Sequence, residues 1–255
     1  MVVFPVDTNP LTDKVLLITG GARRIGAEVC RLLHAEGMRL VIHYRNSSPD
    51  AESLKQELEQ QRPNSVSLIR GDLLTPRKDL QKLVSQAVKT FGQLDVLVNN
   101  ASSFYPTPVG QADEIQWDDL MGINLKAPYF LSQAAAPHLK MTGGCIINIA
   151  DIHADRPLKD HSIYCMAKAG LVMMTQSLAR DLAPDIRVNA IAPGAILWPE
   201  PEPSDTTKAQ AIAKVPLQRL GKPQDIARSV RFLIRDAHYI TGQVITVCGG
   251  KSIAL

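Results

Sequence analysis

Residues 19–26 read Thr-Gly-Gly-Ala-Arg-Arg-Ile-Gly, between an apolar run at 14–19 and a helical pattern at 25–35. Glycines let a backbone turn tightly and approach a pyrophosphate. The N-terminus of the helix that follows offers N–H groups to an anion. The stretch therefore predicts the strand, turn and helix of a dinucleotide-binding fold. It lacks the usual middle glycine, and Arg24 stands near that place.

On either side of this turn, short β-rich runs alternate with longer helical patterns. Near-continuous apolar strands indicate burial on both faces, and the alternation indicates parallel strands with right-handed crossovers. The sequence therefore predicts one Rossmann-type, doubly wound α/β domain over residues 1–255, with a seven-stranded parallel sheet. The expected strands are 14–19, 39–44, 65–70, 94–99, 144–150, 186–191 and 243–247. The expected helices are 25–35, 51–61, 77–91, 125–139, 163–182 and 223–235.

Residues 198–207, Trp-Pro-Glu-Pro-Glu-Pro-Ser-Asp-Thr-Thr, break this alternation. Their three prolines argue against a ladder or a regular helix. The segment is either a solvated surface loop or a mobile lid over the ligand, because it follows the carboxyl end of a strand. Long irregular loops in compact domains are often functional, which favours a substrate lid at 198–215. Leu197 and Trp198 are then expected to contact the substrate.

Composition narrows the class of function. A net charge of +3 over 255 residues, without basic clusters, argues against nucleic acid as a partner. The histidines lack metal-site spacing, and no metal is expected. The four cysteines form no C-x-x-C pair, so buried free thiols in a reducing compartment are expected. With no signal peptide and no apolar run near the ~18 residues that span a bilayer, we expect a cytoplasmic protein with no membrane partner.

The end of the second expected strand indicates which nicotinamide dinucleotide binds. An NAD site would present an acid there to the ribose hydroxyls. Residues 43–47 are His-Tyr-Arg-Asn-Ser instead, and Arg45 and Ser47 could meet a 2′-phosphate. NADPH is therefore the expected cofactor. Asp72, next to Leu73, follows the third expected strand and could accept a hydrogen bond from the adenine amino group.

Tyr164 and Lys168 are four residues apart on the expected helix 163–182, which places them on one face. An unperturbed tyrosine has a pKa of ~10 and donates protons poorly at neutral pH. A neighbouring ammonium favours the phenolate and should lower the pKa of the tyrosine. A lone Tyr-x-x-x-Lys occurs often by chance, so it is informative only together with the other motifs along the chain.

The order of these parts resembles the short-chain dehydrogenase/reductase family along almost the whole chain. The matching parts are the turn 19–26, Asn-Asn-Ala at 99–101, Asn124, Tyr164 with Lys168, and Pro-Gly at 193–194. The resemblance implies that Tyr164 is the acid, Lys168 its electrostatic partner and Asn124 part of a proton relay. It also implies that Pro193-Gly194 borders the nicotinamide and that the chain forms a homotetramer.

Asp151 departs from the common family pattern, which has serine thirteen residues before the tyrosine. An ionised aspartate cannot donate a hydrogen bond and disfavours an adjacent phenolate. If it is protonated, or relays through water, it can supply a proton to a ring nitrogen. That chemistry suits reduction of a C=N bond better than reduction of a ketone.

The Asp-Tyr-Lys arrangement resembles the pteridine reductases. The resemblance extends over residues 99–108 and includes Arg24, His43-Tyr44 and Ser47. It implies that Phe104 stacks on a pterin and sandwiches it against the nicotinamide, an arrangement that aromatic stacking favours. Ser102 and the cofactor phosphates would hydrogen-bond the pterin edge. Taken singly, Phe104 could be a core aromatic and Asp151 a helix-capping or surface acid.

The resulting hypothesis is NADPH-dependent reduction of a dihydropterin, with biopterin, monapterin and folate forms all open. A short-chain carbonyl reductase and a non-enzymatic NADP sensor are the alternatives. The expected catalytic residues are Asp151, Tyr164, Lys168 and Asn124. The expected substrate contacts are Ser102, Phe104, Asp151, Tyr164, Leu197 and Trp198. The expected cofactor contacts are Gly20, Arg23, Arg24, Ile25, Gly26, His43, Tyr44, Arg45, Asn46, Ser47, Asp72, Leu73, Asn100, Ala101, Ser102, Lys168, Pro193 and Gly194.

Overall fold

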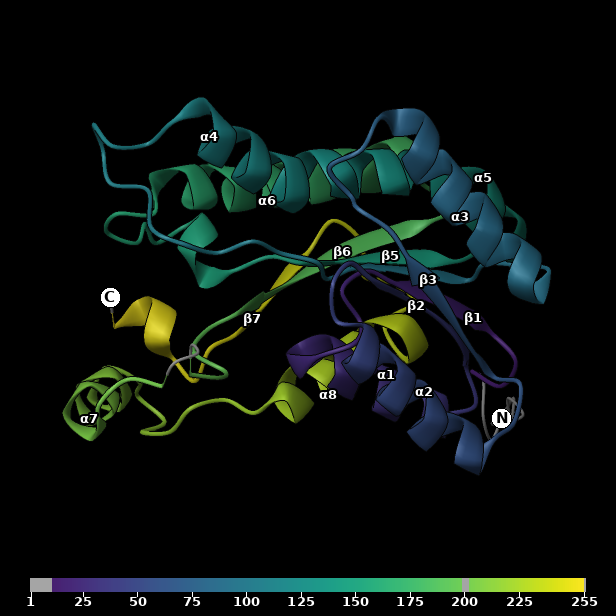
Figure 1. Ribbon diagram of the computed structural model, residues 1–255, viewed down its shortest axis with the longest axis horizontal. Coiled ribbons are helices and arrows are strands. Elements are labelled where there is room, and N and C mark those ends of the chain that lie inside the picture. The colour runs from purple at the N-terminus through teal and green to yellow at the C-terminus, as the bar shows by residue number, and fades with distance from the viewer. Residues whose placement is uncertain (1–10, 199–201, 255) are drawn as a thin grey trace, which may run out of the picture.

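A computed structural model of the chain describes residues 11–198 and 202–254. Seven strands form one sheet in the order β3-β2-β1-β4-β5-β6-β7, and every pair is parallel (Figure 1). This confirms the predicted Rossmann-type doubly wound α/β fold. The strands are β1 (Val15–Ile18), β2 (Arg39–Tyr44), β3 (Val66–Arg70), β4 (Val96–Asn99), β5 (Cys145–Ile149), β6 (Arg187–Pro193) and β7 (Val244–Val247).

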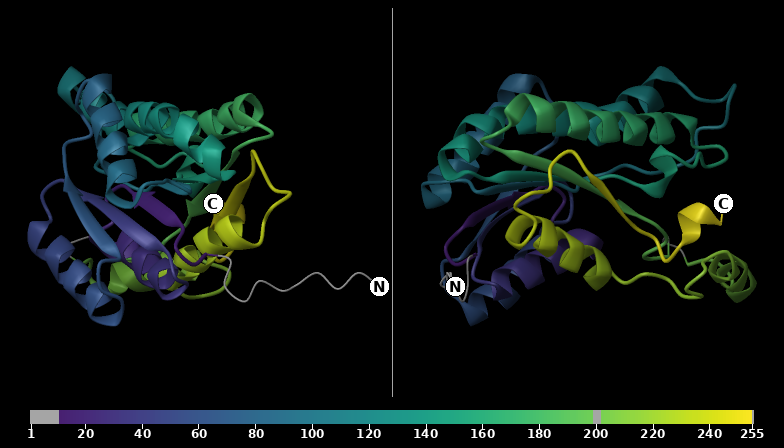
Figure 2. Two further views of the ribbon diagram at one scale, coloured as in Figure 1. Left: turned by 90° about the vertical axis from the view of Figure 1, so that its right-hand side faces the viewer. Right: turned by 180° about the vertical axis from the view of Figure 1, so that it is seen from behind.

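Helices cover both faces of the sheet, as the edge-on view in Figure 2 shows. One face carries α1 (Arg24–Ala35), α2 (Ser48–Gln61) and α8 (Pro223–Arg235) (Figure 1). The other carries α3 (Arg77–Phe91), α4 (Glu114–Met121), the π-helix η1 (Gly122–Lys126), α5 (Ala127–Thr142) and α6 (Ser162–Leu182). The remaining elements are α7 (Asp205–Ala213) and two short 3-10 helices, η2 (Ile152–Ala154) and η3 (Lys251–Ile253).

Alternate side chains of each strand enter two separate cores. In β1, Leu16 and Ile18 pack with α1 and α8, while Val15 and Leu17 pack with α3 and α5. All four are fully buried. A strand in such a sheet needs apolar residues at every position, which explains why the central strands are continuous apolar runs rather than alternating ones.

Among the described residues, five helical elements were not among the expected ones: α4, η1, α7 and the 3-10 helices η2 and η3. The expectation that 198–207 excludes a regular helix is wrong from Asp205 onward, where α7 begins. The helix starts two residues after Pro203, and the Ser204 hydroxyl accepts the N–H of Thr207 as its N-cap. Pro203 stands before the helix and so removes no hydrogen bond from its interior. Residues 199–201 of the expected lid lie outside the described residues.

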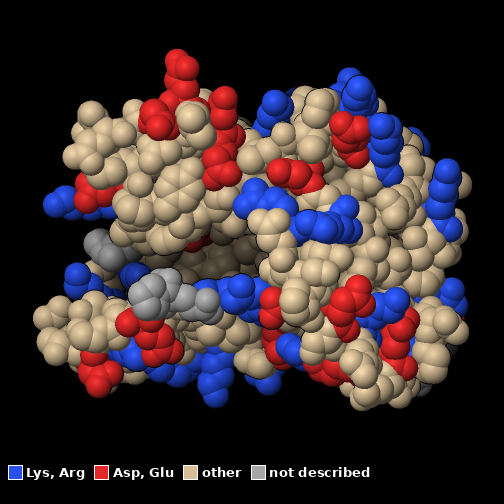
Figure 3. Space-filling view, in the orientation of Figure 1, with Lys and Arg blue, Asp and Glu red and all other residues tan. Residues whose placement is uncertain are grey.

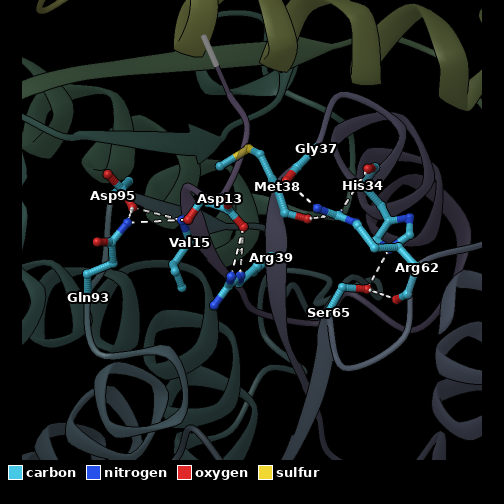
Figure 4. A network of polar contacts seen from close by, with 10 residues as sticks. All are labelled: Asp13, Val15, His34, Gly37, Met38, Arg39, Arg62, Ser65, Gln93 and Asp95. Carbon is cyan, nitrogen blue, oxygen red and sulfur yellow. Dashed lines mark hydrogen bonds and ion pairs between the residues drawn. The ribbon is translucent and has the colours of Figure 1, made fainter. Parts of the chain in front are cut away.

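Two polar clusters lie at the edge of the sheet where the strands begin, and they connect neighbouring strands and loops there (Figure 4). The buried Asp95 carboxylate accepts the N–H of Val15 at 2.7 Å and the amide of Gln93 at 2.9 Å. Arg62 donates to three carbonyls at the end of α1, those of His34, Gly37 and Met38. These bonds satisfy backbone groups left open where helix α1 and strand β1 meet the loops.

Among the described residues, no helix has the length and apolarity needed to traverse a bilayer. The structure describes all four cysteines, and all are free thiols. Cys30, Cys145 and Cys165 are buried as expected, whereas Cys248 is only partly so.

Candidate active site

The predicted site residues gather at the carboxyl edge of the central strands. The glycine turn follows β1, Asn100 to Phe104 follow β4, and Asp151 follows β5, so the three segments converge where the strand order reverses. Figure 3 shows a hollow on this side of the molecule, between the layer of α4 and α6 and the segment that carries α7.

The turn is tight because it packs directly on the segment after β4. Gly20 has a φ of +59°, and a Cβ there would lie 3.0 Å from the Cα of Ala101. A Cβ on Gly26 would lie 2.5 Å from the carbonyl oxygen of Gly20. The Asn100 side chain donates to the carbonyls of Thr19 and Gly20, each at 2.9 Å. These contacts explain why glycines stand at 20 and 26, and they place Asn100 and Ala101 beside the turn.

The N-terminus of α1 has the donor set that a pyrophosphate needs. Among the described residues, no side chain caps it and its first turn holds no acid, so nothing negative competes for its N–H groups. Arg23 stands at the N-cap, 3.9 Å from Asp50. Arg24 opens the helix with a left-handed φ of +54°, and its Nη2 donates to the carbonyl of Trp198 at 3.1 Å. Ile25 continues the helix, half-buried.

His43 holds the turn from β2. The Gly20 N–H donates to its Nδ1 at 3.3 Å, and its Nε2 donates to the carbonyl of Gly71 at 3.1 Å. Burial lowers the pKa of His43 to about 4. Tyr44 and Leu73 are also buried. A neutral His43 thus shapes the turn, and its contact with a cofactor stays a prediction.

Residues 45–47, directly after β2, include no acid. Arg45 is exposed, with Nη1 3.9 Å from Asp72. Asp72 Oδ1 accepts the N–H of Leu74 at 2.9 Å, so one carboxylate oxygen is already engaged in a hydrogen bond within the turn. Asn46 is exposed, and Ser47 precedes α2. A guanidinium and a hydroxyl at this place fit an added phosphate on the ribose.

We expect His43 to make the protein acid-sensitive. The unfolded chain binds this proton near pH 6.5, while the folded chain binds it only near pH 4. The free energy of unfolding should therefore fall as pH drops from 6.5 to 4, by about 3 kcal/mol in total. Urea denaturation across this range should give a flatter profile for His43→Gln than for the parent. His238→Gln, at an exposed position, is the control, and equal slopes for all three proteins would refute the assignment.

Asp151, Tyr164 and Lys168 come together as predicted from the sequence. The Tyr164 hydroxyl donates to Asp151 Oδ2 at 2.8 Å. Asp151 Oδ1 accepts the N–H of His153 at 2.8 Å, so the carboxylate also caps η2 and the helix-capping interpretation is confirmed, while its catalytic role stays a prediction. Lys168 is buried and donates from Nζ to the carbonyl of Ile149 at 2.9 Å.

The pKa of Tyr164 differs from the expectation. Burial, and then the charge and hydrogen bond of Asp151, raise it well above its ordinary value of 10, and the nearby Ser102 hydroxyl only partly offsets this. The expected net lowering of the Tyr164 pKa is wrong here, because burial and Asp151 act in the opposite direction, and burial also lowers the pKa of Lys168 to about 8. The other expectation, that Asp151 disfavours a phenolate, is confirmed. The phenol is therefore held in its protonated form.

Asn124 is positioned by the π-helix η1. Its Nδ2 donates to the carbonyls of Leu120 at 2.9 Å and Ser103 at 3.0 Å, and its Oδ1 accepts the Ser102 hydroxyl at 2.6 Å. The side chain thus takes the place of a regular helical bond to Leu120 and joins η1 to the segment after β4. π-bulges often stand at functional sites, and this one had no signal in the hydrophobic pattern.

Phe104 lies next to the Tyr164 phenol and is 54% exposed, which rules out the core-aromatic interpretation. Its ring meets the Tyr164 ring edge-on, with centroids 4.8 Å apart, and stacks on His161 at 4.7 Å and 17°. The Tyr105 hydroxyl fixes the segment by donating to Asp119 at 3.0 Å. His161 was not among the expected site residues; the available signal was its place three residues before Tyr164, at the N-cap of α6.

The turn after β6 forms a further border of the candidate site. Gly194 packs on Cys248, since a Cβ at 194 would lie 2.6 Å from the Cβ of Cys248. Pro193 ends β6, and Leu197, 39% exposed, and the half-buried Trp198 follow it. Among the described residues, no group of His, Cys, Asp or Glu could hold a metal ion.

The sheet is of the Rossmann type, and its glycine turn leads into a helix without a side-chain cap. Near this turn a protonated phenol lies beside a buried lysine. These features together define a class of protein, the nicotinamide-dependent oxidoreductases. Comparison with known proteins agrees. A family model described as enoyl-(acyl carrier protein) reductase matches residues 20–252. The chain therefore belongs to the short-chain dehydrogenase/reductase family and is an NAD(P)-dependent reductase.

Its relatives fall into two groups. Pteridine reductase 1 of Leishmania tarentolae is 36% identical, over 96% of this chain and 98% of the relative. A 3-oxoacyl-(acyl-carrier-protein) reductase of Staphylococcus aureus is 35% identical, over 93% and 97%. The granaticin polyketide synthase putative ketoacyl reductase 2 of Streptomyces violaceoruber is 36% identical, over 94% and 96%. Overall similarity therefore does not separate a pterin from a ketoacyl substrate.

Proposed function

We propose that the protein reduces dihydropterins to tetrahydropterins with NADPH. The observation that carries the proposal is the Asp151–Tyr164 hydrogen bond beside the exposed ring of Phe104. A flat nitrogen heterocycle can stack on such a ring while its edge reaches the phenol. The bound cofactor supplies the hydride, which goes to the carbon of the C=N bond.

The chain supplies the proton to the ring nitrogen. Tyr164 holds a proton that it does not lose to solvent, because a phenolate beside Asp151 would be costly. As the nitrogen gains electron density it becomes the better base and takes the phenol proton. The capping bond from His153 fixes the carboxylate that orients the phenol. Asp151 then passes a replacement proton from water to Tyr164.

NADPH rather than NADH follows from the residues after β2. The ribose of the adenosine half would lie near Arg45 and Ser47, where the sequence 43–47 offers no carboxylate to accept from a 2′-hydroxyl. We also propose that the loop from Leu197 to α7 covers the substrate. A homotetramer is the proposed assembly, which light scattering would test through a mass of four chains.

A ketoacyl reductase is the second candidate, favoured by the similarity to the ketoacyl reductases. The test is NADPH oxidation with dihydrobiopterin, dihydromonapterin and dihydrofolate, against a β-ketoacyl thioester. The proposal predicts turnover with at least one pterin at a kcat/KM far above that of the thioester. Turnover of the thioester alone would overturn it, and tight NADPH binding without any turnover would indicate a sensor instead.

A further inference from the structure

The stack of His161 on Phe104 has no part in hydride or proton transfer as described so far. The two rings lie nearly parallel, with centroids 4.7 Å apart and planes at 17°. Tyr164 meets the Phe104 ring at its edge, with an angle of 77° between the planes. His161 therefore covers one face of Phe104. Because Phe104 is still 54% exposed, its opposite face is the one available to a ligand.

The backbone near Phe104 is joined to the loop that carries His161. The N–H of Thr107 donates to the carbonyl of Asp160 at 2.6 Å, which connects the segment after β4 to the loop before α6. The phenyl ring itself has no polar atom that could hold it in place, so contacts with His161 and Tyr164 orient it. An exposed ring without such support would have to be ordered when a ligand binds, at a cost in affinity.

His161 is held firmly enough to provide that support. It stands at the N-cap of α6, and its carbonyl accepts the N–H of Cys165 at 2.9 Å. Its Nδ1 donates to the carbonyl of Lys159 at 2.7 Å, which selects the tautomer and orients the imidazole. Asp160, with a left-handed φ of +60°, turns the chain between these two residues. The imidazole is thus fixed relative to the first turn of α6.

From this geometry we propose that His161 is a positioning residue that acts through Phe104. It supports the phenyl ring from behind, so that a flat substrate stacks on the opposite face without first having to order the ring. The inference rests on the proposed function and narrows the substrate class to flat conjugated rings. A ketoacyl chain has no ring and gains nothing from an oriented phenyl face.

Two substitutions at position 161 test the support. Affinity for the dihydropterin that the parent reduces best is measured by calorimetry on the full chain saturated with NADP⁺, which has no hydride to give. His161→Ala should raise this Kd, and KM in the NADPH assay, by about three- to ten-fold, which is the contribution of one aromatic pair. The stack persists through the reaction, so kcat should change less than about two-fold. His161→Phe restores a ring and should return Kd and KM to within about two-fold of the parent.

His238→Ala is the matched control, because it removes an imidazole from an exposed position outside the site. It should leave Kd, KM and kcat unchanged. Unchanged Kd and KM in His161→Ala would overturn the inference and leave the proposed function standing. Equal losses in His161→Ala and His161→Phe would also overturn it, since a stacking ring would then not be what matters. A parent that neither binds nor reduces any of the three dihydropterins would overturn the proposed function and the inference together.

Discussion

Tyr164→Phe is expected to lower kcat for dihydropterin reduction by about 10²- to 10⁴-fold, the range typical of a lost general acid. The change removes one oxygen from a ring that is 4% exposed, so the packing around it is preserved. Lys168 keeps its bond to the Ile149 carbonyl, and the site keeps its shape. Stopped-flow NADPH oxidation in a single turnover would measure the chemical step directly.

The control for Tyr164→Phe is cofactor affinity. The Kd for NADPH should change less than about three-fold, because the lost hydroxyl binds Asp151 and not the glycine turn. A variant that keeps more than a tenth of the parent rate would mean that another group delivers the proton, and the role assigned to the phenol would be wrong.

Asp151→Ser is expected to reduce kcat/KM for a dihydropterin by at least about 10²-fold. The serine hydroxyl is too short to bond both Tyr164 and the N–H of His153, the two contacts that the carboxylate makes at 2.8 Å. Because the charge and hydrogen bond of Asp151 raise the pKa of Tyr164, their removal should lower that pKa. The alkaline limb of the pH–rate profile should then move to lower pH, since the protonated phenol is the active form.

The double variant distinguishes a shared role from two separate ones. If Asp151 and Tyr164 act as a unit, Asp151→Ser with Tyr164→Phe should be about as slow as Tyr164→Phe alone. Asp151→Asn keeps the size of the side chain but has one acceptor oxygen for the two bonds that the carboxylate accepts and cannot pass a proton, so it should be slow as well. Full activity of Asp151→Ser would point to a carbonyl reductase, in which serine serves at this position.

The fold was predictable because it depends on local patterns. Apolar runs such as 144–150 and the turn at 19–26 identify buried strands and a phosphate-binding loop without any tertiary information. The pairing of Tyr164 with Lys168 followed from helical spacing, and the expectation that Asp151 joins them followed from the family resemblance. The structure then placed all three within one site.

What the sequence could not supply depends on contacts between distant segments. In the π-helix η1, the Asn124 side chain donates to the carbonyls of Leu120 and Ser103. Hydrophobic periodicity carries no signal of these two hydrogen bonds. The direction of the Tyr164 pKa shift depends on burial and on the 2.8 Å contact with Asp151. The stacking of His161 on Phe104 and the bond from Arg24 to Trp198 likewise join residues that the sequence gives no reason to pair.

The most direct test of the account is a crystal structure of the protein with NADPH and a dihydropterin. The account predicts that the pterin lies between the Phe104 ring and the nicotinamide, with the Tyr164 hydroxyl within about 3 Å of its ring edge. A pterin bound elsewhere, or a Phe104 face closed to it by His161 while Tyr164 points away from the ligand, would contradict the account.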